Sequence, residues 1–136
     1  NRFVGSFIGS PPMNFLDGTL RAVNGQFVVE SHGARIPLPR AREIKGLAAD
    51  GNVLVGIRPE HIDVVAAPAA EAIPARVVVL EPIGAQQLLT VRVGEETMKV
   101  TTPPEFQAEP GQQVWLRLNP ERIRLMDVQT ASAILM

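Results

Sequence analysis

The stretch VLVGIRPEHIDVV, residues 53–65, returns 61 residues later as VWLRLNPERIRLM, residues 114–126. Each copy has an apolar run of strand-like composition, an x-Pro-Glu-x-Ile corner and a second short apolar run. Proline closes a strand where no amide donor is needed, so each copy predicts a strand, a corner and another strand. Such a repeat indicates two strand-rich half-units, at about 15–66 and 72–127, which we expect to pack as one body.

Short β-like runs continue through much of the remaining chain. Asn24-Gly25 stands between the runs Thr19–Val23 and Gln26–Val29, and it is a strong hairpin signal because both residues tolerate a positive φ. Twelve prolines and eleven glycines lie mostly between such runs, which is typical of an all-β sandwich or barrel. Residues 40–48 are expected to form a short helix or an irregular crossover. The other predicted strands are Val53–Ile57, Ile62–Val65, Ala75–Leu80, Leu89–Val93, Met98–Val100, Val114–Leu118 and Ile123–Leu125.

The N-terminal segment has a helical pattern instead. Phe3, Phe7 and Ile8 fall on one apolar stripe of a helix predicted over residues 2–9. Gly9-Ser10-Pro11-Pro12 ends this helix, because proline lacks an amide donor. A helix of this length is marginal alone, so we expect the three apolar side chains to dock on the barrel or on a second copy. Since the chain starts without an initiator methionine, we interpret it as a fragment of a longer protein.

Composition and motifs argue against catalysis, metal binding and nucleic-acid binding. The chain has no cysteine, and its formal net charge of −1 gives no electrostatic footprint for nucleic acid. It contains neither a Gly-x4-Gly-Lys-Ser/Thr phosphate loop nor a Gly-x-Ser-x-Gly nucleophile elbow. His32 and His61 have no metal-ligand spacing around them. Glu95-Glu96 is interpreted as a charged hairpin turn, although carboxylates that only the fold brings together stay open as an alternative.

The corner differs between the two copies at two positions. His61 is replaced by Arg122 and Arg58 by Asn119, whereas proline and glutamate are kept. The Pro-Glu element is therefore interpreted as architectural, and Arg58 and His61 as candidate functional additions. In one alternative these two residues contact a small oxyanion. In the other, which we favour, Arg58 pairs with a local carboxylate and His61 is exposed at a strand end.

Four segments carry a family resemblance that spans nearly the whole chain. They are NRFVGSFIGSPPMNFL (1–16), GIRPEHI (56–62), LEPIGAQQLLTVRVG (80–94) and PERIRLMD (120–127). They resemble the C-terminal part of the ATP-binding subunits of ABC importers, in the subgroup that imports maltose, other sugars and sn-glycerol 3-phosphate.

The resemblance implies an OB-like barrel of the TOBE or MOP type. Residues 1–14 would be the helix and linker that leave an absent ATPase domain, and residues 15–136 the regulatory β-barrel. The implied function is non-catalytic: the domain holds two ATPase domains together and receives regulatory signals. A small-ligand, oxyanion-binding barrel stays the alternative, since related folds hold oxyanions at subunit junctions.

The resemblance also implies cofactors, partners and a location. No cofactor is implied for this chain, whereas the parent subunit would use ATP and Mg²⁺. The implied partners are a second copy in a homodimer, the upstream ATPase domain, transmembrane permease subunits and a regulatory protein, but no nucleic acid. The implied location is cytoplasmic, at the inner face of the cell membrane as part of a transporter complex.

Candidate regulatory or interface residues follow by position. Arg58-Pro59-Glu60-His61 contains the family's Arg-Pro-Glu motif. Glu81 and Gly84 fall in its Glu-x-Leu-Gly segment, where this chain has Ile83 in place of leucine. Ala85-Gln86-Gln87 follows, where the family usually has an acidic or small polar pair.

Overall fold

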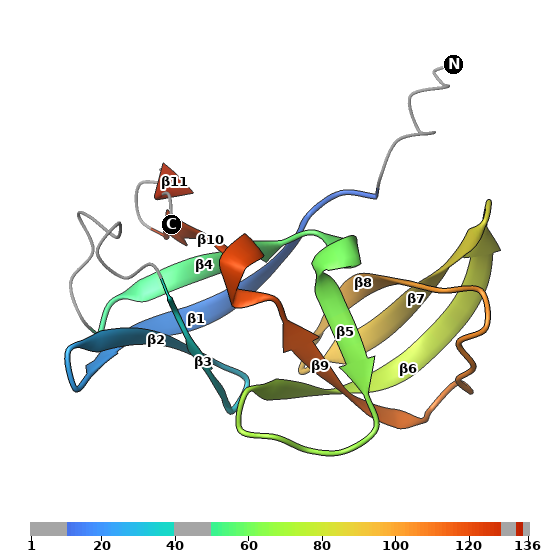
Figure 1. The fold of residues 1–136 in the computed structure, drawn as a ribbon, viewed down its shortest axis with the longest axis horizontal. Coiled ribbons are helices and arrows are strands. Elements are labelled where there is room, and N and C mark those ends of the chain that lie inside the picture. The colour runs from blue at the N-terminus through green and yellow to red at the C-terminus, as the bar shows by residue number, and fades with distance from the viewer. Residues whose placement is uncertain (1–10, 40–49, 129–132, 135–136) are drawn as a thin grey trace.

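The computed structural model describes residues 11–39, 50–128 and 133–134 of the 136-residue chain (Figure 1). These residues form strands β1 to β11 and two one-turn 3₁₀ helices, η3 (Pro59–His61) and η4 (Pro120–Arg122). The predicted all-β class is confirmed. The predicted N-terminal helix and the segment 40–48 lie outside the described residues.

The strands form two antiparallel sheets. Sheet A has the order β11-β10-β4-β1-β2-β3, and sheet B has the order β5-β9-β6-β7-β8. The edge strands β5 and β8 of sheet B also contact each other, so this sheet curls round toward a barrel. The strands of sheet A are β1 (Asn14–Val23), β2 (Gln26–Ser31), β3 (Ala34–Pro37), β4 (Asn52–Ile57), β10 (Arg124–Asp127) and β11 (Ala133–Ile134). Those of sheet B are β5 (Ile62–Val65), β6 (Ala72–Ile83), β7 (Gln86–Val93), β8 (Glu96–Thr102) and β9 (Gln113–Leu118).

The two copies of the repeat run in opposite directions between the sheets. The first copy leaves sheet A with β4, turns through η3 and enters sheet B as β5, where it pairs with β9. The second leaves sheet B with β9, turns through η4 and enters sheet A as β10, where it pairs with β4. Each corner has proline at the start of a 3₁₀ turn, a position that needs no amide donor. Each sheet therefore contains a strand that arrives from the other.

Strand β1 begins at Asn14, not at Thr19 as predicted. Buried and exposed residues alternate along it, and Leu16 is fully buried. Gly18 interrupts the apolar pattern in the sequence but occupies an inward position, where an added Cβ would lie 2.9 Å from Val29 Cγ2. The predicted strand was too short because the inward residue at this point is a glycine, which does not look like a core residue in the sequence.

One continuous core contains side chains from both sheets. Burial of each large aliphatic side chain contributes roughly 1.5–3 kcal/mol, so this cluster supplies most of the stabilisation. The Asn24-Gly25 turn is confirmed, with φ of 52° and 78°. The largest fully buried side chains are Leu16, Leu20, Val29, Ile36, Leu38, Ile57, Ile73, Leu89, Met98, Leu116, Leu118 and Leu125.

A buried asparagine joins the two sheets. Asn14 Nδ2 donates to the carbonyl of Lys99 at 2.9 Å and to that of Ile57 at 3.3 Å, while its Oδ1 accepts from the Lys99 amide at 2.8 Å. Because Lys99 lies in the edge strand β8, the side-chain amide occupies the place of a neighbouring strand. The first residue of β1 is thus fixed to the edge of sheet B.

Candidate functional site

The corner at η3 is closed by a local ion pair. Arg58 Nε lies 3.1 Å from Glu60 Oε2, and Pro59 between them is buried. Burial opposes ionisation of Glu60, but hydrogen bonds from its own backbone amide and from Arg58 outweigh that effect and lower the pKa of its carboxyl. The geometry agrees with a local pair for Arg58 rather than an anion contact, because the guanidinium already has a carboxylate partner.

His61 is half-buried rather than simply exposed at the strand end. Its Nδ1 atom is enclosed and has no hydrogen-bond partner in the described part of the chain. The cause is long-range, since η3 packs against β8. The backbone carbonyl of His61 accepts a hydrogen bond from the amide of Asn119 at 3.0 Å, so the first corner is hydrogen-bonded to the start of the second.

Glu81 and Gly84 belong to a different part of the molecule. Glu81 is exposed on β6 opposite Leu88 of β7, and Gly84 forms the β6–β7 turn with φ of 62°. Figure 1 shows this hairpin at one end of the molecule, whereas η3 lies beside β5 nearer its middle. The sequence candidates therefore form two groups, and Phe3, Phe7 and Ile8 lie outside the described residues.

The β6–β7 hairpin exposes apolar side chains that the sequence did not single out. Val78, Val79 and Ile83 are 42%, 40% and 37% exposed. A register shift between Val77 and Val79 makes Val78 an extra residue in the strand, so two consecutive valines reach the surface. Three valines in a row show no alternation, so the sequence does not indicate which of them faces outward. The one usable sequence signal is the position of Ile83 next to Gly84, where a turn is expected.

The loop after β8 covers one face of this hairpin. Phe106, in the loop after β8, packs against the core, and Gln87 Nε2 fixes this loop by donating to the carbonyls of Pro103 and Phe106, both at 2.9 Å. The cross-strand pairs Val79–Thr90 and Glu81–Leu88 lie on the opposite face, because the alternating pair Leu80–Leu89 faces inward. We call this opposite side the outer hairpin face.

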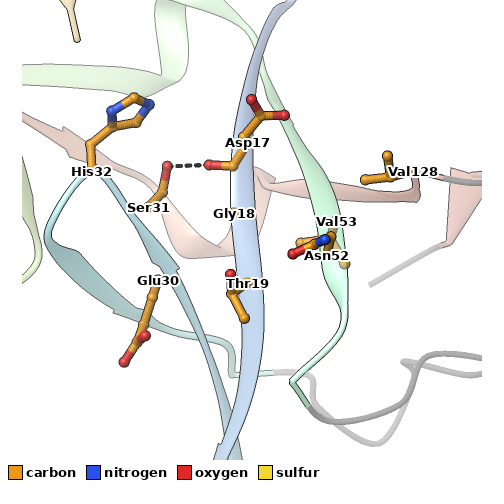
Figure 2. A pocket seen from close by; sticks show the side chains of 9 residues that line it. All are labelled: Asp17, Gly18, Thr19, Glu30, Ser31, His32, Asn52, Val53 and Val128. Carbon is orange, nitrogen blue, oxygen red and sulfur yellow. Dashed lines mark hydrogen bonds between the residues drawn. The ribbon is translucent and has the colours of Figure 1, made fainter.

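A shallow depression lies on sheet A, over β1 between β2 and β4 (Figure 2). Its volume is about 450 Å³. Figure 2 shows β1 and β2 held together at this point by Ser31, whose Oγ donates to the carbonyl of Asp17 at 2.7 Å. The depression is lined by Asp17, Gly18, Thr19, Glu30, Ser31, His32, Asn52, Val53 and Val128.

Charge in the depression is negative and partly neutralised. Glu30 accepts from Arg21 Nε and Arg35 Nε, both at 3.1 Å. The hydrogen bond from Arg21 is the main cause that lowers the pKa of Glu30. Asp17 and Glu30 would repel an oxyanion, so the depression does not suit the anion alternative.

Two family models match the chain, and they overlap at the first corner. The MalK OB fold domain matches residues 9–62, and the TOBE domain matches residues 55–126, more than half of the chain. The chain belongs to the TOBE domain family. The overlap between the models contains η3 and its Arg-Pro-Glu motif, and the TOBE match also contains the β6–β7 hairpin.

ABC transporter ATP-binding proteins are similar to this TOBE domain along nearly all of its length. It is 35% identical to the uncharacterized protein y4oS of Sinorhizobium fredii, over 98% of this chain and 34% of that protein. It is 31% identical to the sulfoquinovosyl glycerol transport protein SmoE of Agrobacterium fabrum, over 97% and 36% respectively. It is 36% identical to the sn-glycerol-3-phosphate import protein UgpC of Salmonella typhimurium, over 98% and 36%. The chain spans about a third of the length of these relatives, and its OB and TOBE regions are not catalytic.

A solved structure has the same fold as this TOBE domain. It is the cytoplasmic molybdate-binding protein ModG with molybdate bound, which aligns with a TM-score of 0.63 over 82% of this chain and 94% of that chain. Its sequence identity is 17%, so the likeness shows the fold alone.

The described residues contain neither a metal-binding cluster nor a membrane-spanning helix. Within residues 11–39, 50–128 and 133–134, no group of three or more His, Cys, Asp or Glu side chains is placed to hold a metal ion. In the same ranges, no helix has the length and apolar character needed to cross a membrane.

Proposed function

We propose that this TOBE domain is the regulatory and dimerisation module of the ATP-binding subunit of an importer for sugars or sn-glycerol 3-phosphate. It holds two ATPase domains together as they act on ATP and Mg²⁺, and it receives regulatory signals. Its partners are a second copy, its own ATPase domain, the permease subunits and a regulatory protein. The assembly works at the cytoplasmic face of the membrane.

The observation that carries this proposal is the extent of the match. Import ATP-binding proteins align with 97–98% of the chain, which makes up only about a third of their length. The fold is consistent with a passive scaffold, since Arg58 and Glu60 at the first corner are paired with each other and the depression on sheet A is shallow and lined by Asp17 and Glu30.

The outer hairpin face supports the dimerisation part of the proposal. Val78, Val79 and Ile83 are each more than a third exposed on one hairpin. Single exposed apolar residues are ordinary, but a group on one strand is typical of a protein–protein contact. The Phe106 loop covers the other side of the hairpin, so the group is open in one direction only.

Sedimentation over a concentration range tests the proposal. We expect the 136-residue chain to self-associate and neither to bind nor to hydrolyse ATP. Val79→Lys should weaken self-association, because it places a charge in the apolar group. Val23→Lys is the matched control, since Val23 is 37% exposed in the β1–β2 hairpin. ATP turnover by the purified chain would contradict the scaffold function, and equal effects of both variants would remove the hairpin from the interface.

A further inference from the structure

We propose that the outer hairpin face pairs with the same face of a second copy about a two-fold axis, with Arg76 and Arg92 of each copy meeting Glu81 of the other. This rests on the proposed dimerisation and adds which residues make the contact.

Two arginines face each other at one end of this surface. Arg76 and Arg92 are direct cross-strand partners, and both are exposed. Like charges at such positions destabilise a sheet. Arg76 Nη1 donates to the carbonyl of Gly111 at 2.9 Å, and neither arginine forms an ion pair with a carboxylate in the described ranges. The two positive charges thus have no neutralising carboxylate among these residues, and only Arg76 has a neutral acceptor.

A carboxylate lies at the other end of the same surface. Glu81 pairs with Leu88, and the pair Val79–Thr90 lies between it and the two arginines. At about 3.3 Å per residue, Glu81 and Arg76 are roughly 15 Å apart along the strand, too far for an ion pair within one copy. Along β6 the face is therefore positive, apolar and negative in order, and beside its centre Lys99 of β8 donates from Nζ to Thr90 Oγ1 at 2.8 Å.

Such an order is self-complementary. A two-fold axis that lies in the contact plane at the Val79 position and runs perpendicular to β6 exchanges the ends of the face and brings Glu81 of one copy over Arg76 and Arg92 of the other. The two oxygens of one carboxylate accept hydrogen bonds from both guanidinium groups. Val79 packs on Val79 at the centre with Val78 beside it, and Ile83 lies beyond Glu81 at the outer end of the contact. Removal of water from this centre strengthens the flanking ion pairs.

The charge order selects a second copy over other occupants. An acidic partner would satisfy Arg76 and Arg92 but would be repelled by Glu81. A basic partner would meet the reverse arrangement. A second copy satisfies both ends at once, with one contact made twice.

Mixing of charge-reversed variants tests the pairing. Glu81→Arg makes both ends of the face positive, and the double variant Arg76→Glu/Arg92→Glu makes both ends negative. We expect each variant alone to have a dimer Kd raised at least about tenfold relative to the unchanged chain. An equimolar mixture should form a heterodimer, because every facing pair is then of opposite charge. Sedimentation, with a fluorescent label on one variant, measures both effects.

Matched controls make the same charge changes elsewhere. Glu71→Arg lies at an exposed position before β6, and Arg122→Glu/Arg124→Glu lies at exposed positions around the second corner. Neither control should change dimerisation, and their mixture should form no heterodimer beyond that of the unchanged chain. Circular dichroism of every variant verifies the fold.

The outcomes separate this inference from the dimerisation on which it rests. If the unchanged chain dimerises and the reversed variants dimerise equally well, the pairing is wrong and dimerisation stands. If the unchanged chain stays monomeric at all concentrations, both the dimerisation and the pairing are wrong. If each reversed variant alone dimerises weakly and their mixture recovers the dimer, while the control mixture shows no such gain, the pairing is supported.

Discussion

The two corners of the repeat have one backbone and two different surroundings. Both η3 and η4 begin with proline, continue with glutamate and pass into a strand through a buried isoleucine. At η3 the preceding residue is Arg58, whose side chain pairs with Glu60. At η4 it is Asn119, whose Oδ1 accepts from the backbone amide of Glu121 at 3.0 Å. The kept residues make the turn, whereas the varied ones close it by different means.

The varied residues follow from what packs on each corner. η3 lies against β8, which half-buries His61. Arg122 at the equivalent place in η4 is exposed, and no residue of that turn is buried. A difference between the two copies is therefore not by itself evidence of function, because the two corners pack against different surroundings and accept different side chains.

The largest expected effect tests whether the two corners are equivalent in structure. Ile62 and Ile123 are each 3% exposed and lead from their corners into the core. Either isoleucine changed to alanine should lower the free energy of unfolding by about 2–5 kcal/mol, through lost burial and a residual cavity. Urea unfolding measures both, with Val128→Ala as a surface control. If one variant lowers the free energy of unfolding by less than half as much as the other, the two corners are not equivalent in structure.

A smaller effect distinguishes the two ways of closing the turn. Asn119→Ala leaves the Glu121 amide without its side-chain acceptor and should cost about 1 kcal/mol. Arg58→Ala removes a partly exposed ion pair and should cost less than about 1 kcal/mol. Chemical denaturation at neutral pH compares them directly. The reverse order would mean that Arg58 stabilises more than its own turn.

The strands and turns that depend on local chemistry were predictable. Proline at the corners fixes φ and needs no donor, and Asn24-Gly25 accepts positive φ at both positions. The Arg58–Glu60 pair spans two residues and was also anticipated. These features need no knowledge of what packs on them.

Features that depend on distant strands were not predictable. The exchange of β5 and β10 between sheets and the bonds from Asn14 to Lys99 join residues far apart in the chain. The outward position of both Val78 and Val79 needs a bulge that only the pairing with β7 reveals. The half-burial of His61 depends on β8. The sequence alone therefore did not show that Val78 and Val79 form the apolar part of the proposed interface.

A pH series sharpens the comparison through Glu60. Its pKa lies below the ordinary value of 4.5 in the folded chain, so the ionised form stabilises the fold above that value. This contribution should be lost as the pH falls from about 4.5 through the lower folded pKa. We expect Glu60→Gln to show a shallower loss of stability with acid than the unchanged chain. Because the pair is partly exposed, the difference should be small and should shrink in high salt. Identical acid profiles would show that Arg58 and Glu60 do not interact in solution.

The smallest expected effect concerns an oxyanion at the first corner. Sulfate, molybdate or sn-glycerol 3-phosphate at one hundred times its Kd would stabilise the chain by about 2.7 kcal/mol, a shift that thermal unfolding resolves easily. We expect no such shift, because Glu60 is paired with Arg58 Nε and its carboxylate repels an anion at the same guanidinium. Arg58→Ala and Arg122→Ala form the matched pair of variants. A rise in Tm that is lost in Arg58→Ala and kept in Arg122→Ala would contradict this expectation. It would mean that the anion competes with Glu60 for Arg58, and that only the first corner is a binding site.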